Sequence, residues 1–354
     1  MIGAGPWGLM TAWRAAAAGG RVALVDDGRP PAAHVAAGML GPWSEADERE
    51  RPLHDLMVRA LERWPGLAEG LAAASGRDPG FRHSGAVVAA VRPEQRADVL
   101  RRAAVLRSWG RDAAWLPAAD LRAREPGLGP AAAGGLDLPD EHQVEPRALL
   151  AALRAAAEGA GVRMVAGRAI RLAAGAVRLA DGATLRTGRV VLAAGHAAGA
   201  LAARVPVRPV KGQALRLRAA AGAPLPIART VRTPAGYLAP RDAEVVVGAT
   251  MEERRDLTVT AEAVADLLDE ARRAVPECDA LTFAEAGAGL RPATPDGLPA
   301  LGPDPDDPAL VWAVGGYRHG ILLAPLAAEA ACAAAAGGPV PSWAVPLSPG
   351  RFGP

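Results

Sequence analysis

Three glycines near the start of the chain have the spacing of a phosphate-binding turn. The pattern G-x-G-x-x-G is formed by Gly3, Gly5 and Gly8. In a dinucleotide-binding βαβ unit the first glycine makes a tight turn, the second lets the backbone approach the pyrophosphate, and the third lets helix pack on strand. An acidic residue roughly 20 positions further on binds the ribose hydroxyls. The apolar run at 22–25 ends at Asp26, which fits this role better than Asp27.

The first strand of such a unit should precede Gly3, where only Met1 and Ile2 stand. We therefore expect the natural protein to have an upstream apolar strand of roughly five residues. A chance match is the alternative interpretation, because the chain contains 41 glycines. The helix, the Gly19-Gly20 stop, the apolar strand and its terminal acid are separate requirements that are also met. Together they favour a nucleotide site.

Composition limits the classes of function that remain. The 354 residues are enough for one large or two medium domains, and a net charge of +2 does not suggest a nucleic-acid or membrane partner. Lys211 is the one lysine among 40 basic residues, which indicates coding bias rather than a recognition surface. Cys278, Cys332 and the six scattered histidines lack ligand spacing, so no metal is predicted. Without a visible signal peptide or membrane span, the expected location is cytoplasmic.

Helix-type and strand-type segments alternate, which favours an α/β fold. We expect a Rossmann-like parallel sheet from discontinuous segments, and a second, α+β domain with an antiparallel sheet in 207–250. The predicted cofactor domain comprises 1–80, 140–206 and 287–345, the substrate domain 81–139 and 207–286, and the tail 346–354. Helices are expected at 53–74 (interrupted at Pro65-Gly66), 93–109, 146–158, 260–275 with Thr260 as N-cap, and from near Gly320 to 336.

Further segments, in order along nearly the whole chain, resemble the glycine oxidases of thiamine biosynthesis. These are flavoenzymes of the D-amino acid oxidase superfamily. The segments are AAGMLGP at 36–42 with Glu45, VEPR at 144–147, PVRPVKGQ at 206–213, GATME at 248–252, GLRP at 289–292 with TPDG at 294–297, and YRHGILL at 317–323.

The resemblance implies an FAD-dependent oxidase with a discontinuous FAD domain. Such enzymes convert glycine, and similar small amines or D-amino acids, to the imine by hydride transfer to flavin N5, and oxygen is reduced to hydrogen peroxide. The imine would supply the thiazole of thiamine. Gly289 stands where methylated-amine oxidases carry a flavin-bonding cysteine, so non-covalent FAD is implied. The resemblance also implies a homo-oligomer, for instance a tetramer.

The resemblance also assigns site residues. Catalytic roles fall on Tyr237, Arg291 and Arg318, with Met251 as a pocket wall. The expected cofactor-binding residues are Gly3, Gly5, Gly8, Asp26, Ala37, Gly38, Met39, Ala194, Gly195, Gly316, His319, Gly320 and Ile321. Arg291 matches the carboxylate-binding arginine, because a guanidinium can grip glycine's carboxylate in a bidentate pair.

Plainer interpretations remain open at these positions. A structural ion pair is the alternative for Arg291 and for Arg318, and core packing is the alternative for Tyr237 and Met251. Lys211 is interpreted as a structural charge rather than an oxygen activator. At the level of function, the rivals are a D-amino acid or sarcosine oxidase or dehydrogenase, a flavin-binding protein without turnover, and a plain NAD-binding protein.

Overall fold

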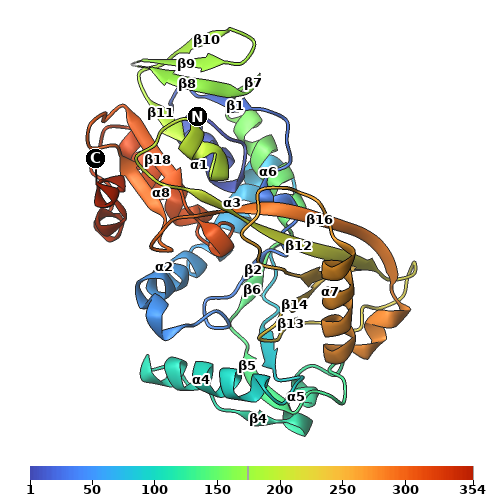
Figure 1. The fold of residues 1–354 in the computed structure, drawn as a ribbon. Helices are drawn as coiled ribbons and strands as arrows, with labels where there is room; N and C mark the ends of the chain where they lie inside the picture. The colour runs from blue at the N-terminus through green and yellow to red at the C-terminus, as the bar shows by residue number, and fades with distance from the viewer. Residues whose placement is uncertain (174, 354) are drawn as a thin grey trace.

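The computed structural model describes residues 1–173 and 175–353. Segments from the start, middle and end of the chain gather around a parallel sheet, and the segments between them build a larger mixed sheet (Figure 1). The long strands β12 (Arg208–Arg218) and β16 (Thr282–Ala293) of the mixed sheet cross the middle of the molecule (Figure 1). This is the α/β architecture, with a second sheet, that the sequence predicts.

The parallel sheet brings together strands that are far apart in the sequence. Ile2 bridges Val25 on one side and Leu192 on the other, both in parallel, so residues 1–2 take the central position. The short strands beside it are apolar and buried, as is usual where helices cover both faces of a parallel sheet. The order is β7 (Arg163–Ala166), β1 (Ala23–Asp26), residues 1–2, β11 (Val190–Leu192), β18 (Leu310–Val314) and the antiparallel β17 (Ala300–Pro303).

Helices around the parallel sheet bury apolar faces against one another. In α6 (Pro146–Gly159), for example, Leu149, Leu153 and Ala156 recur at helical spacing and are almost fully buried. Burial of one leucine side chain contributes about 1.5–3 kcal/mol. α1 packs against both α6 and α8, and α3 packs against α6. These helices are α1 (Pro6–Ala17), α2 (Arg51–Leu61), α3 (Trp64–Ser75), α6 (Pro146–Gly159) and α8 (Ala324–Ala335).

The second sheet has eight strands. Its order is β16 (Thr282–Ala293), β12 (Arg208–Arg218), β15 (Glu244–Gly248), β14 (Tyr237–Arg241), β13 (Thr230–Arg232), β3 (Ala86–Ala89), β5 (Gly134–Leu138) and β4 (Leu116–Pro117). Within 207–250 the strands pair antiparallel as predicted, while β13 joins β3 in parallel. β16 pairs with β12 along its whole length, so the predicted boundary at 286/287 falls inside a continuous strand.

Three helices accompany this sheet: α4 (Gln95–Ser108), α5 (Ala118–Arg124) and α7 (Ala261–Ala274). α7 packs against β12 and β15. The predicted cap of α7 is confirmed, because the Thr260 hydroxyl accepts a hydrogen bond from the Ala263 N–H at 3.3 Å. Such a cap is worth about 1 kcal/mol.

Two helix boundaries differ from the prediction. The helical stretch 53–74 is interrupted as predicted, but the break lies at 62–63 rather than at Pro65-Gly66. Pro65 stands in the first turn of α3, where its missing N–H costs nothing. The last helix begins at Ala324, because Tyr317–His319 form a 3-10 turn and 320–323 form further turns before it. Both differences arise at helix starts, where several local turns compete.

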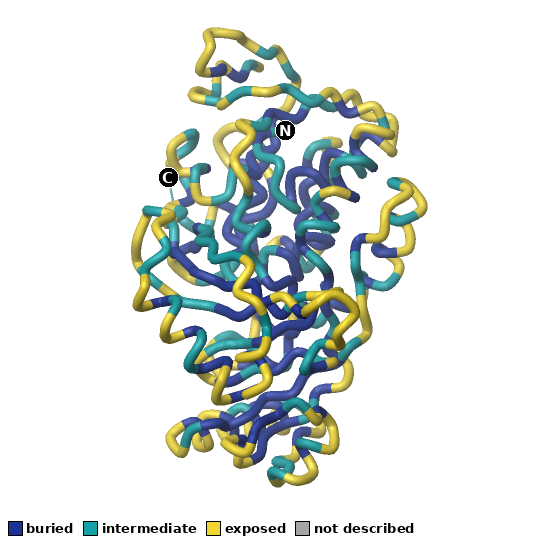
Figure 2. The backbone as a smooth tube through the Cα atoms, turned by 90° about the vertical axis from the view of Figure 1, so that its right-hand side faces the viewer, coloured by how far each residue is buried: buried dark blue, intermediate teal, exposed yellow. Residues whose placement is uncertain are grey.

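Two small sheets complete the fold: β8 (Ala169–Ala173), β9 (Ala176–Leu179) and β10 (Thr184–Arg186), and β2 (Met39–Leu40) with β6 (His142–Gln143). Buried backbone fills the interior of both main parts, and exposed backbone lies at the outer loops and along the β8–β10 ribbon (Figure 2). Among the described residues, no helix is both long and apolar enough to cross a bilayer.

Candidate active site

A large cavity of about 1650 Å³ is lined by both main sheets. The parallel sheet contributes the glycine turn after residue 2 and the carboxyl ends of β1, β11 and β18. The eight-stranded sheet contributes residues of β12, β14 and β16. Ligands in α/β sheets bind at the carboxyl ends of parallel strands, so this cavity is the candidate site.

Every predicted site residue except Gly8 lines this cavity. On the cofactor side these are Gly3, Gly5, Asp26, Ala37, Gly38, Met39, Ala194, Gly195, Gly316, His319, Gly320 and Ile321. On the substrate side they are Tyr237, Met251, Arg291 and Arg318. Gly8 lies under the turn instead, where a Cβ would fall 1.8 Å from the Gly3 carbonyl oxygen. This agrees with the packing role predicted for the third glycine.

The glycine turn presents an uncapped helix start to the cavity. Gly3 has φ of +99°, a conformation that favours glycine, and its N–H donates to the Val25 carbonyl at 3.0 Å. Gly5 is the N-cap of α1, and within the described part of the chain no side chain caps the first turn. The free N–H groups and the positive end of the helix therefore suit a phosphate group.

Two carboxylates follow β1 at the same end of the cavity. Asp26 and Asp27 both line it. Asp26 accepts a hydrogen bond from Arg154, and Asp27 Oδ2 accepts one from Arg29 Nε at 2.8 Å. Either oxygen set can also accept from ribose hydroxyls, so this end has the acceptors and donors that a dinucleotide requires.

His319, one of the residues that line the cavity, is a buried histidine. Burial lowers its pKa to about 4, so the imidazole is neutral near pH 7. Within the described part of the chain, its Nε2 has no hydrogen-bond partner. Buried polar atoms in proteins are normally paired, so a bound group at this position fits the arrangement. The neighbouring loop is fixed to α1, because Trp7 Nε1 donates to the Gly320 carbonyl at 2.6 Å.

Arg291 is held with its guanidinium flat against a glycine. Its Nη1 donates to the backbone carbonyls of Thr250 at 3.0 Å and Lys211 at 3.2 Å. A Cβ on Gly212 would lie only 2.2 Å from Nη2, so the guanidinium occupies space that any other residue would fill. Among the described residues no carboxylate pairs with Arg291, so its remaining N–H groups are available to an anion. The ion-pair alternative is therefore not realised for Arg291.

Arg318, in contrast, lies in an ion-pair cluster. Its Nε is 3.3 Å from Glu45 Oε2, and its Nη2 is 3.3 Å from Glu50 Oε2. Glu45 also pairs with Arg232 Nη1 at 2.8 Å. Burial alone would raise the pKa of Glu45, but the charges of the neighbouring Arg232 and Arg318 bring it well below its usual range. Glu45 therefore stays ionised, and Arg318 serves first as its partner.

Tyr237 and Met251 differ in their degree of exposure. The Tyr237 hydroxyl lies beside Gly248, where a Cβ would be 2.3 Å away. Burial raises the pKa of Tyr237 against the opposing charges of Arg291 and Arg232, so the phenol keeps its proton as a hydrogen-bond donor. Met251 is 59% exposed, and its sulfur accepts a hydrogen bond from the Tyr317 hydroxyl at 3.2 Å. Met251 thus lies at the mouth of the cavity rather than in a packed core.

Sequence reasoning missed several residues of the site. Glu45 lies beside one of the segments that resemble the glycine oxidases, whereas Arg232 lies in none of them. Arg102 of α4 also lines the cavity, and its buried Nε has no partner among the described residues. Gly212 and Gly248 make room for Arg291 and Tyr237. A glycine within a strand was the available signal, since such positions often mark a close approach.

Residues 1–334 match the family described as FAD dependent oxidoreductase. The chain belongs to this family. The cofactor predicted from the sequence is thereby confirmed as FAD. The N–H donors of the glycine turn, the carboxylate acceptor of Asp26 and the imidazole of His319 fit it. The fold prediction is also confirmed, because the oxidoreductase superposes on the crystal structure of glycine oxidase from Geobacillus kaustophilus with a TM-score of 0.91, at 31% identity, over 98% of this chain and 96% of that one.

Other relatives extend the comparison. The oxidoreductase is 34% identical to the glycine oxidase of Geobacillus kaustophilus over 92% of this chain and 89% of that protein. It is 35% identical to the bifunctional protein ThiO/ThiG of Synechocystis over 84% of this chain, but spans only 44% of that protein's length. The structure of iminodiacetate oxidase from Chelativorans sp. BNC1 matches with a TM-score of 0.86, at 27% identity, over 98% of each chain.

Proposed function

We propose that this oxidoreductase oxidises glycine, and similar small amines or D-amino acids, to the imine. The observation that carries the proposal is the Arg291 guanidinium, which lines the cavity with free N–H groups and without a carboxylate partner among the described residues. Glycine offers little besides its carboxylate for a protein to hold. A guanidinium can pair with that group through two parallel hydrogen bonds.

The chain's own residues would bind and orient the substrate. Arg291 holds the carboxylate, and the protonated phenol of Tyr237 donates to it or to a water beside it. Glu45 keeps Arg318 and Arg232 neutralised at the cavity wall, so that they compete less for the substrate anion. FAD, when bound, would supply the two-electron acceptor for the hydride that leaves the substrate carbon, with oxygen as the final acceptor reduced to hydrogen peroxide.

The substrate amine enters this scheme without its extra proton. Glu45 has a pKa below its usual range and His319 a pKa of about 4, so neither readily accepts a proton from an ammonium at neutral pH. The neutral fraction of the amine is therefore the reactive form. We further propose that the imine is supplied for the thiazole of thiamine, with support from the relatives named glycine oxidase and ThiO/ThiG.

The test is direct. The protein is purified with FAD, and hydrogen peroxide is measured with glycine, sarcosine and both enantiomers of alanine. Glycine should give the highest kcat/KM with oxygen as acceptor. Faster turnover of sarcosine or D-alanine would assign the chain to a neighbouring oxidase. Reduction of artificial dyes without peroxide would indicate a dehydrogenase, and a flavin that none of these amines bleaches without oxygen would leave a flavin-binding protein. Light scattering tests the predicted homo-oligomer.

A further inference from the structure

The single lysine of the chain is fully buried beside the candidate carboxylate anchor. Lys211 lies on β12 with 0% exposure. Its Nζ is 3.0 Å from Asp256 Oδ1 and 3.6 Å from Glu252 Oε2. Both carboxylates belong to residues 249–260, which connect β15 to α7 and which we name the 249–260 loop. A buried ammonium is costly without such partners, so these two ion pairs fix the loop to the strand.

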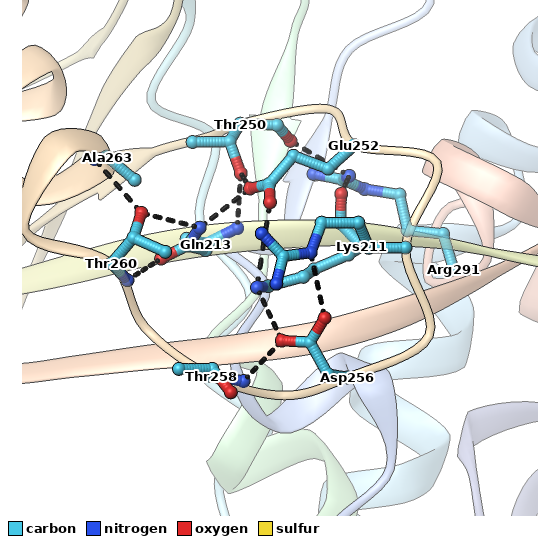
Figure 3. Close-up of polar contacts among 10 residues, drawn as sticks. Lys211, Gln213, Thr250, Glu252, Asp256, Thr258, Thr260, Ala263 and Arg291 are labelled. Carbon is cyan, nitrogen blue, oxygen red and sulfur yellow. Dashed lines mark hydrogen bonds and ion pairs between the residues drawn. The ribbon is translucent and has the colours of Figure 1, made fainter.

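A neighbouring glutamine strengthens the same attachment. Gln213 Nε2 donates to Glu252 Oε1 at 2.7 Å, and Gln213 Oε1 accepts from the Thr260 N–H at 2.8 Å. The Thr250 hydroxyl also donates to Glu252 Oε1, at 2.6 Å. The loop is therefore tied to β12 near both of its ends and at its middle (Figure 3). Hydrogen bonds and the charge of Lys211 together lower the pKa of Glu252 against the effect of burial.

The loop is in turn one of the two supports of Arg291. The Arg291 Nη1 donates to the Thr250 carbonyl on the loop and to the Lys211 carbonyl on the strand (Figure 3). The Lys211 carbonyl also accepts from the Glu252 N–H at 3.0 Å. If the loop moves away from β12, one of the two carbonyls that aim the guanidinium moves with it. The direction of Arg291 thus depends on the contacts of Lys211.

The opposite side of the loop forms part of the cavity mouth. Met251, Arg255 and Leu257 line the cavity, and both Met251 and Leu257 are 59% exposed. These side chains have little packing of their own to hold them. The positions of these side chains therefore depend on the loop backbone, which is held through Glu252 and Asp256.

We infer that Lys211 is a positioning residue, which aims Arg291 and sets the cavity mouth by holding the 249–260 loop. The kinetic part of this inference rests on the proposed function, because it assumes that Arg291 binds the substrate carboxylate. The structural part does not. Glu252 and Asp256 have side chains that are 23% and 38% exposed. Once Lys211 is replaced they can be hydrated, so the loop should loosen locally instead of the whole protein unfolding.

The experiment compares Lys211→Met and Asp256→Asn with Glu253→Gln. Glu253 is a matched control, because it lies on the same loop and its ion pair with Arg208 of β12 is exposed, so this pair contributes little to holding the loop. We expect KM for glycine to rise about fivefold or more in Asp256→Asn, which corresponds to ~1 kcal/mol, with a smaller change in kcat. Glu253→Gln should leave both constants unchanged. Lys211→Arg, which retains the charge, should be closer to wild type than Lys211→Met.

A second readout does not depend on turnover. Amide hydrogen exchange should be faster across residues 249–260 in Lys211→Met and Asp256→Asn, and unchanged there in Glu253→Gln. Asp256→Asn changes a partly exposed side chain, so it keeps the test usable if Lys211→Met does not fold. Unchanged exchange and unchanged KM in Asp256→Asn would overturn the inference. If the wild type does not oxidise glycine but exchange is still faster in the two variants, the proposed function is overturned. The structural part of the inference, that Lys211 holds the 249–260 loop, then still stands.

Discussion

Replacing Gly212 with alanine should disable the carboxylate anchor without changing any charged residue. Gly212 lies in β12, whose extended backbone alanine adopts as easily as glycine does. Its added Cβ, however, would lie 2.2 Å from Arg291 Nη2, 2.3 Å from Nη1 and 2.4 Å from Cζ. Ordinary contact to a Cβ begins at about 3.4 Å, so Cζ would have to retreat by about 1.0 Å (3.4 − 2.4). The two backbone carbonyls that hold Nη1 would then lose their geometry.

A displacement of that size is large for a binding group. Misplacement of a catalytic or binding group by about 1 Å can lower the rate by ~100-fold. We therefore expect kcat/KM for glycine to fall by about two orders of magnitude in Gly212→Ala, mostly through KM, with FAD content unchanged. The assay is peroxide release over a range of glycine concentrations, together with the flavin absorbance of the purified protein.

Gly66→Ala is the control for the effect of the substitution itself. Gly66 lies in α3, and a Cβ there meets nothing within 4 Å. Its kinetics should match the wild type, and its stability should rise slightly because alanine favours a helix. If Gly212→Ala keeps kcat/KM within about twofold of the wild type, a barrier change below ~0.5 kcal/mol, the assignment of Arg291 as the anchor is refuted.

Three further outcomes are expected. Arg291→Leu should raise KM for glycine steeply, by the equivalent of roughly 2–5 kcal/mol, with FAD retained; wild-type kinetics would remove Arg291 from the site. D-alanine should be oxidised more slowly than glycine, because its extra methyl group needs space that a pocket built for glycine does not provide, and L-alanine should give no peroxide. Burial raises the pKa of Glu141 to about 6 from 4.5, so the native state binds more protons between these values and stability should fall by about 2 kcal/mol as pH rises through them. The measurement is the free energy of unfolding in urea, at pH 4.5 and pH 7, for the wild type and for Glu141→Gln. The change with pH in the variant is subtracted from that in the wild type. This subtraction is needed because His319, whose pKa is lowered, makes the protein more stable as pH rises over the same range.

Local signals in the sequence predicted the cofactor end of the site. Three features depend on residues that are close in the sequence: the glycine turn, the strand that ends at Asp26 and the cap at Thr260. The residues concerned are separated by a few positions or by the length of one helix. Conformational preferences act over that range, so a spacing pattern captures them. The helix starts at Trp64 and Ala324 were placed less well, because several turns of similar stability compete at the beginning of a helix.

The substrate end depends on contacts between distant segments. Position 212 requires a glycine because the Arg291 side chain, 79 positions later (291 − 212), packs against it. No local sequence pattern indicates this requirement. Glu45 meets Arg232 and Arg318 only after three separate segments have folded together. Because arginine is so frequent in this chain, residue type alone does not predict which arginine forms an ion pair with which carboxylate.

The contrast between Arg291 and Arg318 also depends on contacts between distant segments. Both stand in apolar or glycine-rich and proline-rich segments, and for each the sequence leaves an ion pair open as the alternative to an anion site. The fold separates them: Arg318 faces Glu45 and Glu50, whereas Arg291 faces two backbone carbonyls. Carbonyl oxygens orient a guanidinium but leave its full charge uncompensated. A half-buried cation held in this way binds an incoming carboxylate without first breaking an existing ion pair, and this property distinguishes a substrate anchor from a structural arginine.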